Sequence, residues 1–311
     1  MAEEHHTQRS TSDSGVTTQE ELRFPSGDGS CAATVFWPRA YGSGDLPAVV
    51  MANGGGMTRG DGLPRFAERF AEAGFVAVTF DFRHLGDSDG APRQLLDHDR
   101  HRADLTAAVA FARGLSGVDA ERVALWGFSY NGGHVVRVAA EDGRLAAAVA
   151  MCPIVNRLAF TRYGDRGSAL RLAAEAVRAA FARRPVHAPL VGPAGSLTLL
   201  AQPEAQSAME ALAAADSRWR NELRASPFKP AALFRPVRHA RRVGCPLMVI
   251  LGLHDTVVPP RPIERVAARA PRAELHRYPV NHFGGFLDGF DDVVRDQIDF
   301  LTRHLGSANS D

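Results

Sequence analysis

The sequence of 311 residues lacks the features that define several large classes of protein. Its charges nearly cancel, leaving a formal net charge of +1, and no basic stripe or acidic tail stands out. Nucleic acid is therefore not an expected partner, because proteins that bind it carry clustered positive charge. No apolar run approaches the roughly 20 residues that a membrane-spanning helix needs, so no membrane partner is expected. The chain also shows no internal repeat.

Cysteine is scarce, and Cys31, Cys152 and Cys245 lie far apart in the chain. Neither a CxxC spacing nor an even disulfide pattern is present. We therefore expect reduced, buried thiols and a cytoplasmic location, since disulfides are rare in that compartment. Residues 1–19 are polar and lack the apolar region of a secretory signal, so we predict a disordered tail there.

Short apolar runs alternate with helical patterns from Glu20 onward, and 45% of the residues are hydrophobic. This alternation predicts an α/β fold with a mostly parallel, twisted sheet that helices cover on both faces. The predicted strands are 31–37, 47–52, 75–82, 122–127, 145–151, 246–251 and 274–278. The predicted helices are 63–74, 99–113, 130–140, 262–270 and 291–304.

The alternation stops between Pro153 and Arg242, in a stretch that is rich in Ala and Arg and has a helical pattern at 169–182. We interpret residues 153–242 as a helical lid inserted into a core of residues 20–152 and 243–311. A surface decoration without contact to a functional site is the alternative interpretation.

Residues 122–135 read RVALWGFSYNGGHV, an apolar strand that runs into Gly127, then Ser129, then a glycine-rich helix start. This is the context of a nucleophile elbow, in which a serine lies on a tight turn between a strand and a helix. The helix N-terminus there favours a developing negative charge. The alternative is a glycine-rich junction without a catalytic role. The sequence GDSDG at 86–90 offers Ser88 as a rival, but no apolar helix start follows it.

A serine hydroxyl needs a histidine base, and the base needs a carboxylate that orients it. Asp255 follows the predicted strand 246–251, and His282 follows the next strand along the chain. The ends of adjacent parallel strands meet at one edge of a sheet, so we predict that these two side chains lie beside Ser129.

The other histidines are weaker candidates for the base. His254 adjoins Asp255 and would point elsewhere, and His134 is expected to pack within its helix or line a site. His98 and His101 share a helix face with acidic residues, but without a third clear ligand we interpret that face as solvated. We predict neither a metal site nor a cofactor.

Catalysis by such a serine requires N–H donors aimed at the oxyanion of the intermediate. One predicted donor is the backbone N–H of Tyr130, and the other is that of Gly55 in the loop NGGGM after strand 47–52. The alternative, a phosphate-binding glycine loop, is disfavoured because neither GxGxxG nor a Walker lysine follows.

Five motifs, ANGGG, FDFRHLGDSDG, GFSYNGGH, GLHDTVVP and YPVNHF, together resemble the α/β-hydrolase family over about residues 20–305. The chain is most similar to bacterial esterases, thioesterases, peptidase-like hydrolases and polyketide transferases of that family. The resemblance implies the α/β-hydrolase fold, with Ser129 as nucleophile, Asp255 as acid, His282 as base, and Gly55 and Tyr130 as oxyanion donors.

Two positions depart from the family pattern: Asn53 stands where many members have histidine, and Asn131 where many have glycine. These departures concern the oxyanion geometry rather than the three catalytic candidates. The resemblance also implies that Arg83 and Asp87 hold the loop after strand 75–82 in shape.

These observations predict a serine hydrolase that cleaves an ester, thioester or related acyl bond of an apolar small molecule through an acyl-enzyme. An acyltransferase, a C–C bond hydrolase or a cyclase of secondary metabolism would use the same residues. A ligand-binding protein without turnover is the alternative from another class, because a fold does not determine a function. A homodimer is a candidate assembly.

Overall fold

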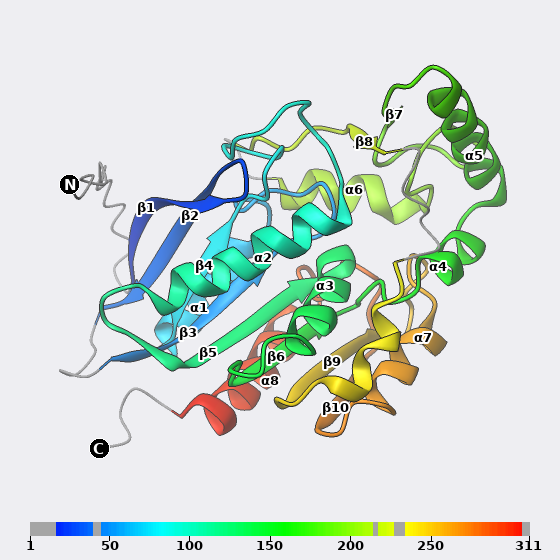
Figure 1. Ribbon diagram of the computed structural model, residues 1–311. Helices are drawn as coiled ribbons and strands as arrows, with labels where there is room; N and C mark the ends of the chain where they lie inside the picture. Colours follow the sequence, from blue (N-terminus) through cyan, green and yellow to red (C-terminus); the bar gives the residue numbers. More distant parts are fainter. Residues whose placement is uncertain (1–16, 40–44, 214–216, 227–233, 307–311) are drawn as a thin grey trace.

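The computed structural model describes residues 17–39, 45–213, 217–226 and 234–306. At its centre lies an eight-stranded sheet with the strand order β1-β2-β4-β3-β5-β6-β9-β10 (Figure 1). The strands are β1 (Thr17–Ser26), β2 (Gly29–Pro38), β3 (Leu46–Ala52), β4 (Val76–Phe80), β5 (Val118–Phe128), β6 (Ala147–Met151), β9 (Leu247–Gly252) and β10 (Ala273–Tyr278).

The sheet is parallel from β4 to β10, whereas β2 runs antiparallel to both β1 and β4. Every residue of β3, β4, β6 and β9 is buried. Such strands are apolar on both faces because helices cover both sides of a parallel sheet. The predicted α/β architecture is confirmed.

Helices α2 (His98–Arg113) and α3 (Ser129–Ala139) lie on one face of the sheet, and α1 (Leu63–Glu72) and α8 (Phe290–Leu305) lie on the other (Figure 1). Helix α7 (Pro260–Ala267) packs on β9 and β10. Within the described ranges, no helix is both long and apolar enough to cross a membrane.

Strand β1 begins at Thr17, so the predicted tail 1–19 extends too far by three residues, 17–19. Residues 1–16 of that prediction lie outside the described residues. The polar sequence TTQEELRFPS forms a strand because β1 is at the edge of the sheet, where one side chain face can remain exposed. Backbone pairing with β2 along its full length stabilises it.

The segment between β6 and β9 contains α4 (Arg157–Tyr163), α5 (Arg166–Phe181), β7 (Val186–Ala188), α6 (Pro203–Leu212), β8 (Leu223–Ala225) and the short 3-10 helices η2 (Pro236–Arg238) and η3 (Ala240–Arg242). Figure 1 shows α4, α5, β7 and β8 gathered beyond the carboxyl ends of the central strands. Besides the helices, the segment contains β7 and β8, which pair antiparallel as a separate two-stranded sheet that the sequence did not indicate. Arg224 of β8 also exchanges backbone hydrogen bonds with the loop before α2, at Gln94 and Leu96.

The Gln297 side chain joins α8 to the sheet through buried polar contacts with Trp126 of β5 and Met151 of β6. The indole Nε1 of Trp126 in β5 donates a hydrogen bond of 2.7 Å to Oε1 of Gln297 in α8, and both side chains are fully buried. We expect Gln297→Leu to lower the free energy of unfolding by about 1–3 kcal/mol, because the indole N–H then lacks an acceptor. Urea unfolding of the variant measures this. The exposed control Gln206→Leu should change stability by less than about 0.5 kcal/mol, and equal effects of the two variants would contradict the prediction.

Candidate active site

The turn from β5 into α3 carries Ser129 at its apex. Ser129 has φ = +53°, a backbone conformation that is rare outside glycine, and it is the first residue of α3. Close packing explains the glycines around it. A Cβ on Gly127 would lie 2.6 Å from Cγ2 of Val135, and one on Gly133 would lie 2.2 Å from the carbonyl oxygen of Ile154. The turn therefore holds the Ser129 hydroxyl at the carboxyl edge of the sheet.

The structure brings the three predicted side chains into one hydrogen-bonded row. Nε2 of His282 lies 3.0 Å from Oγ of Ser129, and Nδ1 of His282 lies 2.8 Å from Oδ2 of Asp255. The ring therefore contacts the hydroxyl with one nitrogen and the carboxylate with the other. Ser129, Asp255 and His282 are 8%, 5% and 1% exposed, so water screens these contacts weakly.

The Asp255 carboxylate is fixed by its own backbone surroundings. Its Oδ1 accepts hydrogen bonds of 2.8 Å from the N–H groups of Val257 and Val258, which leaves Oδ2 for His282. The Tyr163 hydroxyl of α4 donates to the Asp255 backbone carbonyl at 3.0 Å. Residues of the inserted segment thus touch the site directly, a contact that no sequence motif indicated.

The two positions that depart from the family pattern contact each other. The Asn131 side chain donates a hydrogen bond of 2.6 Å to the backbone carbonyl of Asn53. The Asn53 side chain donates to the carbonyls of Thr58 and Asp61 and accepts from the N–H of Gly54. Together the two asparagines tie the glycine loop after β3 to the first turn of α3.

The residues that carry the two predicted N–H donors are in contact. A Cβ on Gly55 would be 3.2 Å from Cβ of Tyr130, so Gly55 packs against the Tyr130 side chain. Tyr130 is the second residue of α3, where a helix offers its N–H no internal acceptor. In the described part of the chain, the Gly55 N–H also donates to no protein acceptor.

The rival residues have other roles. The Ser88 hydroxyl donates to the carbonyl of Asp81 at 2.6 Å and accepts from the N–H of Ala32, so it holds its loop against β2. Histidine 254 is exposed and is not part of the row. The Arg83 side chain binds the carboxylate of Asp104, with Nε 2.6 Å from Oδ1.

Asp87 also contributes to the shape of the loop after β4. Its N–H donates to Oδ2 of Asp81 at 2.9 Å, and its carboxylate forms ion pairs with Arg59 and Arg218. These contacts agree with the role in loop shape that the family resemblance implies for Arg83 and Asp87.

His101 contradicts the expectation of a solvated helix face. It is 1% exposed, stacks on Phe82 with the ring centroids 4.2 Å apart, and lies with Nδ1 3.1 Å from Oδ1 of Asn131. The prediction of a solvated face was wrong for His101 because α2 directs this side chain toward α3 and not toward water. His134 packs as expected: it is fully buried, and neither ring nitrogen has a hydrogen-bond partner among the residues that the structure describes. Burial therefore lowers the pKa of His134 well below its usual value and lowers that of His101 as well.

Cys152, Asp255 and His282 form the one group in the described ranges with the donor atoms of a metal site, all within 4.8 Å of one another. The chemistry of this group does not suit a metal. Burial and the Asp255 charge raise the pKa of the Cys152 thiol well above its usual value, whereas a metal needs the thiolate. A metal would also displace the hydrogen bonds that His282 makes to Asp255 and Ser129.

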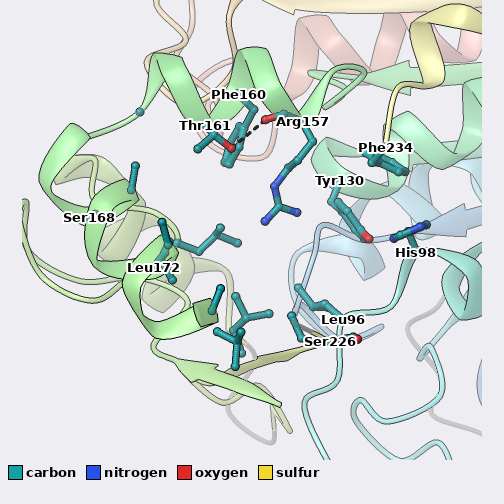
Figure 2. Close-up of a pocket in the computed structure, with 18 of the residues that line it drawn as sticks. Leu96, His98, Tyr130, Arg157, Phe160, Thr161, Ser168, Leu172, Ser226 and Phe234 are labelled. Atoms are coloured by element: carbon teal, nitrogen blue, oxygen red, sulfur yellow. Dashed lines mark hydrogen bonds between the residues drawn. The ribbon is translucent and has the colours of Figure 1, made fainter. Parts of the chain in front are cut away.

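A pocket of about 350 Å³ opens between the inserted segment and the core, and Tyr130 lines it. Figure 2 shows Tyr130 and Phe234 on one side and Phe160 and Leu172 on the other. Ser129 and His282 are not among the lining residues, whereas Tyr130, the residue that follows Ser129 in the chain, is. No pattern in the sequence indicated which residues of the insertion would face it.

This fold and this arrangement of serine, histidine and aspartate define an enzyme of the α/β-hydrolase class. The chain belongs to the X-Pro dipeptidyl-peptidase (S15) family, whose model matches residues 28–284. The predicted family of serine hydrolases is thereby confirmed.

Three relatives illustrate the range of this similarity. The quorum-quenching protein AidA of Acinetobacter baumannii is 36% identical over 288 residues, covering 91% of this chain and 94% of AidA. The thiohydrolase aneE of Aspergillus aculeatus is 34% identical over 147 residues, covering 47% of this chain and 45% of that protein. The polyketide transferase grgF of Penicillium is 34% identical over 110 residues, covering 35% of this chain and 37% of that protein. A crystal structure of the α/β hydrolase GrgF from Penicillium has the same fold, with a TM-score of 0.78 and 23% identity over 92% of this chain and 99% of that one.

The burial of His134 predicts that the free energy of unfolding depends on pH. Its pKa is lowered in the folded protein, so below the unfolded-chain value of about 6.5 the unfolded state binds more protons and stability falls as the pH falls. Urea unfolding between pH 6.5 and 5.5 should show a slope that is smaller in His134→Leu by up to about 1.4 kcal/mol per pH unit. The matched control Val136→Ala, buried on the same helix, should lower stability equally at each pH. A wild-type slope retained by His134→Leu would refute the prediction.

Proposed function

We propose that the protein is a serine hydrolase that cleaves an ester, thioester or related acyl bond of an apolar small molecule through an acyl-enzyme. The observation that carries this proposal is the row of hydrogen bonds from Ser129 through His282 to Asp255. A neutral serine hydroxyl is a weak nucleophile, and a histidine base held in position by a carboxylate is the established way to activate it.

In the proposed reaction, Ser129 Oγ attacks the carbonyl carbon of the substrate while His282 Nε2 takes the hydroxyl proton. The tetrahedral intermediate collapses, the bond to the alcohol or thiol breaks, and His282 returns the proton to that leaving group. Water then attacks the acyl-enzyme, with His282 again as base, and releases the carboxylic acid and the serine hydroxyl. Asp255 holds the imidazole in the required tautomer and stabilises it when it is protonated.

The negative oxygen of each tetrahedral intermediate needs donors that are in position before the reaction. We assign this role to the N–H groups of Tyr130 and Gly55, two residues that are in contact and whose N–H groups have no backbone acceptor in the described part of the chain. Losing one such donor typically costs ~3–4 kcal/mol of transition-state stabilisation. The Asn131–Asn53 hydrogen bond supports the assignment, because it joins the segments that carry the two donors.

The relatives support an acyl bond as the target. One is named a thiohydrolase, and this name favours hydrolysis. Acyl transfer is the second candidate function, in which an alcohol or thiol replaces water in the second step. It is favoured by the similarity to a polyketide transferase and by the low exposure of Ser129 and His282, since a transferase must exclude water.

Further proposals concern alternative reactions, the location of the protein, the inserted segment and the assembly. C–C bond hydrolysis, cyclisation in secondary metabolism and binding without turnover would each use the same pocket. The three cysteines are buried and unpaired, which supports a reducing compartment such as the cytoplasm. We also propose that the segment 153–242 acts as a lid, and a homodimer can be tested by light scattering.

The nucleophile is tested by Ser129→Ala. We expect kcat on short p-nitrophenyl esters and thioesters to fall at least about 10³-fold, because the variant lacks the hydroxyl that attacks the carbonyl and through which His282 and Asp255 act. A fluorophosphonate probe should label the wild-type protein at Ser129 and leave Ser129→Ala unlabelled. Equal turnover by both proteins would refute catalysis by Ser129, and a wild-type protein that neither reacts nor is labelled would favour the binding function.

The link between the asparagines is tested by Asn131→Ala. Removing the side chain leaves the Asn53 carbonyl without this donor, so the glycine loop loses a contact that positions Gly55. We expect kcat to fall roughly 10- to 100-fold while KM changes little, since 1–3 kcal/mol is typical for such a loss and the effect concerns the transition state. Circular dichroism checks that the variant is folded. A folded variant with wild-type kcat would contradict a positioning role.

A further inference from the structure

The pocket between the insertion and the core is largely apolar but contains a cation, Arg157, whose side chain has no hydrogen-bond or ion-pair partner among the residues that the structure describes. Its walls come from α4, α5 and the loops before α2 and η2, and they include Leu96, Phe160, Leu172, Ala176 and Phe234. At about 350 Å³ it has the size of a site for a small molecule. Figure 2 shows the guanidinium group of Arg157 directed from α4 into the middle of this space.

Arg157 has no counterion within the described ranges. No hydrogen bond or ion pair to its side chain is present, its Nε is buried without a partner, and its nearest aromatic contact is the Phe160 ring at 5.8 Å. Burial lowers the pKa of Arg157 below its usual value. Arg157 is half-buried and has no protein acceptor in the described ranges, so its guanidinium N–H groups are available to an anion that enters the pocket.

The two acidic residues that line the pocket, Asp97 and Asp165, accept hydrogen bonds from backbone N–H groups. Oδ1 of Asp165 accepts hydrogen bonds from the N–H groups of Ser168 and Gly195, and this carboxylate caps α5. Asp97 caps α2 in the same way and has a further interaction of its own. Neither carboxylate forms an ion pair with Arg157. The remaining titratable groups that line the pocket are His98, which has a partner, and Tyr130.

The position of Arg157 relative to Ser129 follows from short contacts. The N–H of Ile154, three residues before Arg157, donates to the Ser129 carbonyl at 2.9 Å. The N–H of Arg157 donates to the carbonyl of Phe234, whose ring stacks on Tyr130 with the centroids 5.1 Å apart. Tyr130, which follows Ser129 in the chain, and Arg157 line the same pocket, so an acyl chain that extends from Ser129 past Tyr130 would enter the space that Arg157 faces.

We propose that Arg157 binds a carboxylate on the acyl chain of the substrate, so that the enzyme selects an apolar acyl group bearing a negative charge away from the scissile bond. This inference rests on the proposed function. A guanidinium group binds a carboxylate through two parallel N–H···O bonds, and these bonds are stronger where water is excluded. The apolar walls would contact the methylene chain between the two polar ends.

Activated esters of dicarboxylic acids test the selectivity. Mono-p-nitrophenyl esters of four- to ten-carbon diacids carry the carboxylate, and their methyl p-nitrophenyl diesters are neutral counterparts of similar shape. The measured quantity is the ratio of kcat/KM for the acid to that for the neutral diester at each chain length. We expect the wild-type ratio to exceed one at a particular length, and Arg157→Met to lower it about 10- to 100-fold, the range typical for losing a charged hydrogen bond.

Arg162→Met is the matched control. Arg162 lies on the same helix, is exposed, and does not line the pocket. It removes the same charge from the same element, so a general change of the electrostatic field would lower the ratio in both variants. Arg157→Lys keeps the charge but loses the two-bond geometry, and we expect it to restore the ratio only in part.

A binding measurement separates failure of this inference from failure of the proposed function. Calorimetric titration of monomethyl suberate into the Ser129→Ala protein needs no turnover, and Ser129→Ala/Arg157→Met should bind it at least about 10-fold more weakly. A wild-type ratio near one at every length, or equal ratios and equal affinities with and without Arg157, overturns the carboxylate assignment. Absence of fluorophosphonate labelling of the wild type, together with Arg157-dependent binding, would overturn hydrolysis while retaining the carboxylate site.

Discussion

The tight turn between β5 and α3 is the constraint on which the rest of the site depends. It forces Ser129 to a positive φ and leaves no room for a side chain at Gly127 or Gly133. Backbone strain of this kind persists where the surrounding structure determines the conformation strongly. The sheet supplies that surrounding structure, because β5 is central and paired on both sides with β3 and β6.

Hydrogen bonds extend this rigid turn to its neighbours. The Ser129 carbonyl accepts a hydrogen bond from the N–H of Ile154, near the start of the inserted segment. The Asn131 side chain donates a hydrogen bond to the loop after β3. The site and the insertion are therefore parts of one packed unit, and Tyr163 adds a contact from α4 to the backbone of Asp255. Changes in the insertion can reach the hydroxyl through these contacts.

Burial explains both the chemistry and the selectivity that we propose. The row of Ser129, His282 and Asp255 lies where water screens charge weakly, which strengthens its hydrogen bonds. Burial also raises the free-energy cost of polar groups that lack a partner in the described residues, namely the Arg157 Nε and the two ring nitrogens of His134. An acyl substrate that brings its own carboxylate would satisfy the guanidinium group of Arg157, for which the described residues supply no acceptor.

The sequence by itself determined seven of the eight strands, the helices that cover the sheet and the three side chains of the row, because strand periodicity, small residues at the turn and the ends of adjacent strands are local signals. The polar edge strand β1 carries no such signal. Tertiary structure alone decided the rest. That His101 faces α3, that Asn131 bonds to Asn53, and that Arg157 points into the pocket depend on packing between segments distant in the chain. A lone arginine or asparagine has no periodic pattern, so its partner, or the lack of one, is known only once the segments are packed together.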